Sequence, residues 1–325
     1  MIKEMSMWRN LFRDNNVSTL NEATACGKIR YVVNLSETLH DHLYAEIANE
    51  IAMRPGVKLI LIAGPSSSGK TTSSKRLAMH MRVNGLNPII ISLDDYFRNR
   101  VDTPLDENGE YDFECLEALD VPFLNEQLED LLKGKRVEIP KYDFSSGTRK
   151  FSGQSLQLTE SDVLIMEGIH GLNPALTPQV DDAEKFQLYV SVLTPIAIDE
   201  KTRMTAADYR LLRRMVRDHQ YRGMTAEDTI LRWPSVRAGE EKYILPFKNQ
   251  ADAEFNSGLL YEIPMLKCYA EPLLQVIQKD SPAYAEARRL LGLIRSVIAM
   301  TPVDVRHIPP TSIIREFIGG SSFHY

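Results

Sequence analysis

The stretch KLILIAGPSSSGKTT, residues 58–72, decides the fold of this chain. Its apolar half, Lys58–Ala63, has the composition of a short strand that is buried on both faces. The second half matches the pattern G-x-x-x-x-G-K-[ST] from Gly64 to Thr71, and an amphipathic segment follows it. A strand, a glycine-rich turn and a helix in this order predict a phosphate-binding loop.

The residue types in this loop suit binding of the phosphates of ATP. Glycines let backbone N–H groups turn toward phosphate oxygens, and the N-terminus of the following helix adds positive potential. The Lys70 ammonium can reach the β and γ phosphates, and the Thr71 hydroxyl can bind Mg²⁺. The alternative is a flexible turn with no ligand. The predicted nucleotide contacts are Gly64, Pro65, Ser66, Ser67, Ser68, Gly69, Lys70, Thr71 and Thr72.

Further apolar runs and helical patterns alternate along the chain. We expect strands at Ile89–Ile91, Val163–Met166, Phe186–Leu193 and Ile263–Leu266, and helices at Cys115–Leu132 and Ala206–Gln220. Buried strands that alternate with helices indicate an α/β fold with a parallel sheet between two layers of helices. The sequence therefore predicts a three-layer P-loop NTPase fold.

The organisation that we expect has one core with additions at both ends. Residues 1–56 form an N-terminal helical or linker segment, and residues 57–280 form the P-loop core. Within the core, a polar insertion at about 98–160 covers the site, and a helical lid spans about 203–225. Residues 281–325 supply a last helix and an irregular tail.

Carboxylates follow two of the predicted strands directly. Asp94 and Asp95 end the second strand, and Glu167 ends the third. Because ligands of open α/β sheets bind at this edge, Asp94 is our candidate to orient an acceptor hydroxyl and take its proton. We expect Thr71, Glu167 and Asp94 to hold Mg²⁺, directly or through water. Ordinary turns or helix caps are the alternative for these acids.

Arginines recur at helical spacing in the predicted lid. RLLRRMVR, residues 210–217, places Arg210, Arg213, Arg214 and Arg217 on one face. We expect the apolar face of this helix to pack and the guanidinium groups to be exposed. Guanidinium forks match phosphate oxygens and can stabilise charge on a transferring phosphoryl group. We assign Arg213 and Arg217 to catalysis, with Lys70, and assign Arg214 to the nucleotide; a solvated face paired with acids is the alternative.

The bulk properties exclude several classes of protein. The chain has 325 residues, 43% of them hydrophobic, and a formal net charge of −6, which is unlike a general nucleic-acid binder. Three cysteines lie far apart, so no Cys-x-x-Cys pair exists. We find no signal peptide and no apolar run that would span a membrane. We therefore expect a cytoplasmic protein that binds no membrane and no nucleic acid.

The order and spacing of these motifs resemble the uridine kinase/phosphoribulokinase family over roughly residues 57–270. The resemblance is greatest to the kinase half of bacterial uridine kinases that carry a threonyl-tRNA-synthetase-like N-terminal region, and residues 1–50 resemble the end of its linker. The motifs are GPSSSGKTT, SLDDYF, YDFECLEALD, IPKYDFSSGTRK, LIMEGIHG and RLLRRMVRD.

This resemblance implies ATP-dependent phosphorylation of a nucleoside, uridine or cytidine, at its 5′-hydroxyl, with Mg²⁺. Asp94 matches the catalytic base and Glu167 the Mg²⁺-associated acid. Glu117 matches an acid that holds ribose hydroxyls, Tyr142 an aromatic beside the base, and Arg149 a basic residue after that segment. We also assign Arg210 to the acceptor.

One departure from the family leaves the acceptor open. Uridine kinases have a histidine after the YDF segment, and Gly147 occupies the corresponding position here. A kinase for a sugar phosphate or pantothenate, or a non-catalytic nucleotide-binding regulator, therefore stays an alternative. An RNA-associated module is a weaker one, because no RNA-binding motif is present and the net charge is −6. The sequence leaves open whether the protein is a homo-oligomer.

Overall fold

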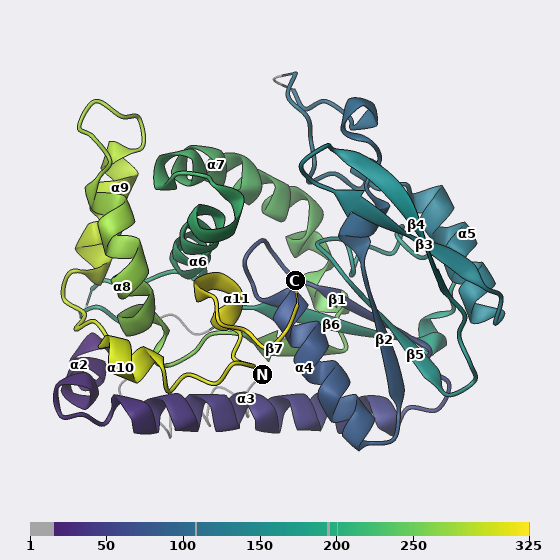
Figure 1. Cartoon of the computed structure of the whole chain (residues 1–325), viewed down its shortest axis with the longest axis horizontal. Coiled ribbons are helices and arrows are strands. Elements are labelled where there is room, and N and C mark those ends of the chain that lie inside the picture. The colour runs from purple at the N-terminus through teal and green to yellow at the C-terminus, as the bar shows by residue number, and fades with distance from the viewer. Residues whose placement is uncertain (1–15, 108, 194–195, 200, 325) are drawn as a thin grey trace.

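The computed structural model describes residues 16–107, 109–193, 196–199 and 201–324. It is a three-layer α/β structure in which helices cover both faces of a five-stranded parallel sheet (Figure 1). The strand order is β2-β5-β1-β6-β7, so the strand that precedes the glycine-rich loop is central. The strands are β1 Leu59–Ala63, β2 Asn87–Ser92, β5 Asp162–Glu167, β6 Lys185–Ser191 and β7 Ala253–Asn256.

Side chains that alternate along the strands build two cores. On one face Ile60, Ile62 and Ile165 join the main core of the molecule. On the other face Leu59, Leu61 and their neighbours pack with the apolar residues of α5. Burial on both faces explains why these strands appear as continuous apolar runs in the sequence.

Ten helices are present in the described part of the chain. The long helix α3 runs along one side of the molecule, and α4 lies against it (Figure 1). Their bounds are α2 Val17–Ala25, α3 Ile29–Ala52, α4 Lys70–Val83, α5 Val121–Leu132, α6 Ala206–Arg222, α7 Ala226–Tyr243, α8 Glu262–Gln275, α9 Tyr284–Ile294, α10 Pro302–Val305 and α11 Arg315–Ile318. In the described residues, no helix is both long and apolar enough to cross a bilayer.

Four of the predicted strands are confirmed, and the fifth is wrong. Ile263–Leu266 lies inside helix α8, and the fifth strand of the sheet is β7. The error has a physical reason, since four consecutive apolar residues do not distinguish a buried strand from a fully buried stretch of helix. All four of these side chains are buried.

Local capping explains where the two predicted helices begin. The helix expected from Cys115 begins at Val121 instead, because the Asp120 carboxylate accepts a hydrogen bond from the N–H of Phe123. The predicted helix Ala206–Gln220 is confirmed as α6. Thr205 and Asp208 form a reciprocal capping box at its start, and Gly223 ends it in the left-handed conformation.

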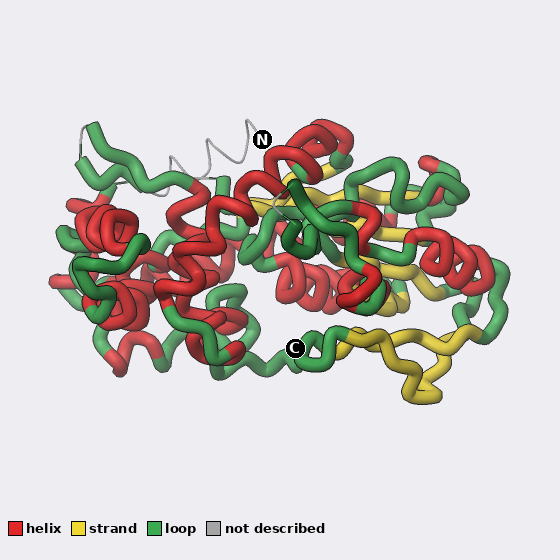
Figure 2. The backbone as a smooth tube through the Cα atoms, turned by 90° about the horizontal axis from the view of Figure 1, so that it is seen from above, coloured by secondary structure: helices red, strands yellow, loops and turns green. Residues whose placement is uncertain are grey.

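The insertion forms a unit of its own beside the sheet. Strands β3, Val137–Asp143, and β4, Thr148–Leu156, pair as an antiparallel hairpin. The hairpin stands apart from the parallel sheet (Figure 2). Between β2 and α5 the chain makes short turns of 3₁₀ helix, including Leu93–Tyr96 and Leu116–Ala118. The carboxyl end of β2 therefore leads straight into the segment that faces the hairpin.

The segment after α9 packs against the core of the molecule. Residues 301–324, named the C-terminal segment here, include α10 and α11 and return to the middle of the molecule (Figure 1). Ile313, Ile314 and Phe317 are fully buried in the main core. Apart from these two four-residue helices the segment is irregular, as expected, and buried apolar side chains hold it against the core. Of the expected N-terminal segment, residues 1–15 lie outside the described residues.

Candidate active site

The glycine-rich loop has the geometry of a cradle for an anion. A Cβ atom at Gly64 would lie 2.0 Å from the carbonyl oxygen of Val190, so only glycine fits beside β6. Gly69 has φ +91°, and Ser67 adopts φ +59°, which side chains rarely tolerate outside functional loops. The hydroxyl oxygens of Ser67 and Ser68 are buried without a hydrogen-bond partner. Orphaned polar groups in this loop fit an absent phosphate.

Lys70, Thr71 and Glu167 meet at the carboxyl ends of β1 and β5. The Thr71 Oγ1 atom lies 3.3 Å from Glu167 Oε1, which also accepts a hydrogen bond of 3.1 Å from Ser92 Oγ. Loss of solvent raises the pKa of the buried Glu167 carboxyl to about 7, and the negative charge of Asp94 adds to the effect. Desolvation lowers the pKa of Lys70, opposed by the charges of Glu167 and Asp94.

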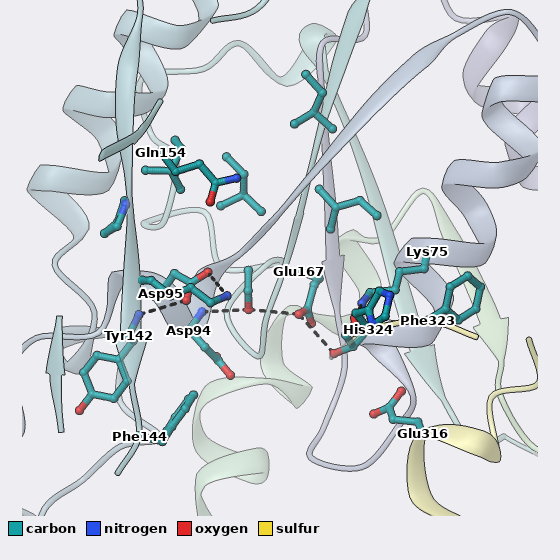
Figure 3. Close-up of a pocket in the computed structure, with 18 of the residues that line it drawn as sticks. Lys75, Asp94, Asp95, Tyr142, Phe144, Gln154, Glu167, Glu316, Phe323 and His324 are labelled. Atoms are coloured by element: carbon teal, nitrogen blue, oxygen red, sulfur yellow. Dashed lines mark hydrogen bonds and ion pairs between the residues drawn. The ribbon is translucent and has the colours of Figure 1, made fainter. Parts of the chain in front are cut away.

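The two adjacent aspartates at the end of β2 have different partners. Asp95 is buried, and its carboxylate accepts hydrogen bonds from Lys141 Nζ at 3.0 Å and from the N–H of Tyr142 at 3.1 Å. It therefore fixes the hairpin to the end of β2. Asp94 points into the space between Glu167 and Phe144 (Figure 3). Desolvation raises its pKa against the opposing charge of Lys70.

Glu114, which the sequence did not single out, interacts electrostatically with this cluster. Glu114 packs against α7, where a Cβ at Gly239 would lie 2.6 Å from its own Cβ. Burial raises its pKa to about 7, and the charges of Arg214, Lys70 and Asp94 all act on it. Glu117 is exposed, and neither glutamate is among the residues that line the pocket described below.

The backbone turn before the 3₁₀ helix Leu116–Ala118 separates these two glutamates. The Asp112 carboxylate accepts hydrogen bonds from the N–H groups of Glu114 and Cys115 at 3.0 and 3.1 Å. Tyr243 Oη of α7 donates to the same carboxylate at 3.0 Å. Both glutamates belong to the short motif YDFECLEALD, so the motif alone does not tell which of them reaches the site. The one local difference in the sequence is that Glu114 directly follows YDF. The turn that selects it depends on a residue of α7.

The expectation of four exposed arginines on α6 is wrong. The side chains of Arg210 and Arg213 are 1% and 0% exposed, and pair with Glu240 at 2.6 Å and Glu262 at 2.5 Å. Every nitrogen of the Arg213 guanidinium is bonded within the protein. Its partners are Glu262, Ser257, and the carbonyl oxygens of Ser67 and Ser68. Arg213 therefore holds the backbone of the phosphate loop in place and has no N–H group left to bind a ligand.

The remaining arginines of α6 gather around one buried carboxylate. Arg214, Arg217 and Arg222 lie 3.2, 3.0 and 3.4 Å from the oxygens of Asp218, which is 0% exposed. Arg214 also donates to the Ser66 hydroxyl of the phosphate loop at 2.7 Å. The charges of Arg217 and Arg222 act on Asp94. Positive charge therefore faces the acidic cluster from the end of α6.

A pocket of about 1230 Å³ opens from the phosphate loop toward the hairpin. Thr71, Asp94, Glu167, Tyr142 and Phe144 are among the residues that line it. Asp94 lies between Glu167 and the two aromatic residues (Figure 3). Tyr142 is buried, its hydroxyl has no partner, and its ring centroid is 5.1 Å from that of Phe144.

Arg149 is not brought to this pocket. It pairs with Asp120 at 2.9 Å, and its guanidinium stacks 4.6 Å from the ring centroid of Phe123. Both partners belong to the start of α5, so this arginine fixes β4 to that helix. A role at the acceptor therefore lacks support from its position.

The donor atoms present fit Mg²⁺. Thr71 and Glu167 converge, Asp94 lies beside them, and all three offer oxygen, the ligand type that Mg²⁺ prefers. No group of three or more His, Cys, Asp or Glu side chains arranged for a metal occurs among the described residues. Mg²⁺ in kinases is usually bound by one or two carboxylates, with water and substrate phosphates as its other ligands.

Comparison with known proteins decides the family. The family model described as "Phosphoribulokinase / Uridine kinase family" matches residues 59–263, from β1 to the start of α8. The chain belongs to this family. The chain is accordingly a phosphotransferase that acts on a hydroxyl-bearing acceptor.

Individual members of the family resemble the chain over the same region. Uridine kinases of Staphylococcus aureus strains JH9 and Newman are each 34% identical over 202 residues, which is 62% of this chain and 87% of the relative. These matches do not show a synthetase-like N-terminal region, which stays a prediction.

Two solved structures can be superposed on about two thirds of the chain. A putative fructose transport system kinase from Silicibacter sp. TM1040 has 19% identity and a TM-score of 0.47, with 65% of this chain and 98% of that chain covered. A possible uridine kinase from Bacillus stearothermophilus has 21% identity and a TM-score of 0.43, with 65% and 96% covered.

Proposed function

We propose that this protein transfers the γ-phosphoryl group of ATP to the 5′-hydroxyl of a nucleoside of the uridine or cytidine type. The relationship to uridine kinases supports the acceptor class. The observation that carries the proposal is the position of Asp94. Its side chain lies between Glu167 and the aromatic residues Tyr142 and Phe144 in the pocket, and the charge of Lys70 acts on it. An acceptor hydroxyl bound there would face the phosphate loop.

Each residue of the acidic cluster has a distinct role in this mechanism. Asp94 orients the acceptor hydroxyl and takes its proton. Lys70 offsets the charge that develops on the transferring group. Thr71 and Glu167 would hold Mg²⁺, which would offset the negative charge of the phosphates. Glu114 replaces Glu117 as the proposed partner of the acceptor's ribose hydroxyls, because the charges of Asp94 and Lys70 act on Glu114, whereas Glu117 is exposed.

The arginines divide between support and catalysis. We propose that Arg214 and Arg217 act on the phosphates, since Asp218 holds both, Arg214 donates to the Ser66 hydroxyl of the loop, and the charge of Arg217 acts on Asp94. Arg210 and Arg213 position that loop instead, through its backbone carbonyls. Because α6 is buried along its inner turns, closure over ATP would involve its last turn rather than the whole helix.

The aromatic end of the pocket suggests how the base is read. A Cβ at Gly147 would lie 2.8 Å from atoms of the Arg100 side chain, so no larger residue fits at this position. Arg100 donates to the carbonyl of Phe144 at 2.7 Å, and its charge acts on the Tyr142 hydroxyl. We propose that Arg100 supplies the donor that histidine supplies in other members, and that Tyr142 and Phe144 contact the base.

Because residue 147 is glycine, a second candidate function also stays open. A kinase for a sugar phosphate or pantothenate would need no donor for a pyrimidine, and the arginine at this end could bind an acidic group instead. Phosphoryl transfer from ATP would be unchanged, because the residues around the phosphate loop are the same in both cases. Only the acceptor distinguishes the two candidates.

The test is release of ADP from Mg·ATP with each acceptor in turn. Uridine, cytidine, other nucleosides, ribulose 5-phosphate and pantothenate are compared with a reaction that lacks an acceptor, and the product is identified. We expect stimulation by uridine or cytidine with formation of the monophosphate. Stimulation by a sugar phosphate or pantothenate alone would replace the nucleoside with that acceptor. ADP binding without stimulation by any acceptor would contradict the proposal.

A further inference from the structure

A carboxylate from the C-terminal segment occupies donor groups of the phosphate loop. Glu316 Oε2 accepts a hydrogen bond of 2.6 Å from Thr72 Oγ1 and another of 3.2 Å from the Thr72 N–H. Thr72 is in the first turn of α4, where backbone N–H groups have no partner within the helix. These are the groups that a P-loop presents to phosphate oxygens. A carboxylate therefore occupies an anion site that the nucleotide needs.

The backbone that carries Glu316 is fixed in place on both sides. Ser312 Oγ donates to the buried carboxylate of Glu37 in α3 at 2.6 Å, and that carboxylate also binds Arg76 of α4 at 3.1 Å. A Cβ at Gly69 would lie 2.7 Å from Ile313 Cγ2, so the segment touches the loop directly. Phe317 is buried, and the Arg213 guanidinium lies 5.1 Å from its ring centroid.

The Glu316 side chain itself is less constrained than its backbone. It is half-buried, and it lines the solvent-open pocket together with Thr71 and Glu167 (Figure 3). Its hydrogen bonds in the structure are to Thr72. A rotation about its own bonds can therefore move the carboxylate out of the loop while Ile313 and Phe317 stay buried. No unfolding of the segment is required.

We infer that Glu316 is an autoinhibitory carboxylate that competes with a phosphate group of the nucleotide for Thr72. Two anions cannot share one pair of donors, and the negative charge of Glu316 also acts on Lys70 and Glu167. Nucleotide binding must displace this side chain, which weakens affinity until the carboxylate leaves. This inference rests on the nucleotide site of the proposed function, but it does not depend on which acceptor is used.

The experiment measures ADP affinity by titration calorimetry without an acceptor, for the full chain and for Glu316→Ala and Glu316→Gln. We expect Glu316→Ala to bind ADP about 5- to 150-fold more tightly, the range of ordinary coupling between two sites. Glu316→Gln keeps an acceptor oxygen without the charge, and we expect an intermediate gain. Glu46→Ala, which removes an exposed carboxylate from α3, is the matched control and is expected to leave affinity unchanged.

Hydrogen exchange in the ligand-free proteins tests the contact separately. We expect the Thr72 amide to exchange faster in Glu316→Ala than in the parent, because it loses its acceptor. Equal or weaker ADP binding by Glu316→Ala, with the parent binding normally, would overturn autoinhibition alone. If neither protein binds ADP, the inference and the proposed nucleotide site both fall.

Discussion

The proposed phosphate side of the site is built from residues that follow the ends of neighbouring parallel strands, whereas the proposed acceptor side is built from segments that are distant in the sequence. Lys70, Asp94 and Glu167 come together because β1, β2 and β5 are adjacent and parallel. Glu114 and Tyr142 reach their positions through contacts with α7 and with Asp95. The first side is encoded locally, and the second depends on tertiary packing.

The largest expected effect comes from the phosphate side. Asp94→Asn keeps the shape of the side chain and removes its ability to accept a proton, so we expect kcat to fall about 10²- to 10⁴-fold. ADP affinity should stay close to that of the parent, because the phosphate loop is untouched. Steady-state kinetics and calorimetry measure the two quantities. Turnover near the parental value would show that another group takes the proton.

Substitution of a buried arginine of α6 should mainly reduce stability, whereas substitution of a pocket arginine of α6 should mainly reduce turnover. Arg213→Met leaves Glu262 buried without its partner, so we expect the free energy of unfolding to fall by about 3–5 kcal/mol. Arg217→Met removes one of three arginines around Asp218, and we expect it to lower kcat with a smaller loss of stability. Urea denaturation and kinetics on both variants measure these effects. Similar stability losses in the two variants would contradict the division.

Two glutamates of one motif provide the sharpest test of the acceptor side. Glu114→Gln should reduce kcat/KM for the acceptor about 10- to 100-fold, since it removes a charged hydrogen-bond partner. Glu117→Gln is the matched control, and its exposed position predicts little change. The KM of ATP should stay constant in both. A larger loss in Glu117→Gln would restore the assignment made from the sequence.

The smallest effect concerns a buried histidine beneath the turn that carries Glu114. Burial lowers the pKa of His170 from 6.5 to about 4, so the folded protein keeps it neutral while the unfolded chain takes up a proton. Its contribution to stability is complete above pH 6.5 and is lost as the pH falls from 6.5 toward 4. At pH 5.5 the loss should be about 1.4 kcal/mol relative to pH 7.5.

His170→Phe provides the comparison for this effect, because phenylalanine does not titrate. Its free energy of unfolding should fall less between pH 7.5 and 5.5 than that of the parent. Urea denaturation at the two pH values measures the difference. Parallel losses in the two proteins would show that His170 is not kept neutral on folding.

Features that depend on residues close together in the sequence could be predicted, and features that depend on packing between distant segments could not. The strand and phosphate loop that begin at Lys58 could be predicted from local sequence, since strand, turn and helix are consecutive. The segment Ile263–Leu266 has the same local character as a strand, and its helical state depends on the packing of α8 in the core. Local pattern was sufficient in the first case and ambiguous in the second.

The arginines of α6 show the same limit within one helix. Their spacing predicts a shared face, and the structure has that helix. The spacing does not predict that Glu240 and Glu262 pair with Arg210 and Arg213, because those acids come from other helices. An arginine beside a distant acid has no signature in its own segment.

The sequence by itself determined the α/β class, the phosphate loop and the acids at the strand ends, because these depend on residues adjacent in the chain and on the regular geometry of parallel strands. Tertiary structure alone decided that Glu114 is close enough to feel the charge of Asp94, which arginines are buried, and that Glu316 reaches Thr72 across the molecule. Each of these depends on side chains that meet only when distant segments pack, and a contact of that kind leaves no periodic pattern in the sequence.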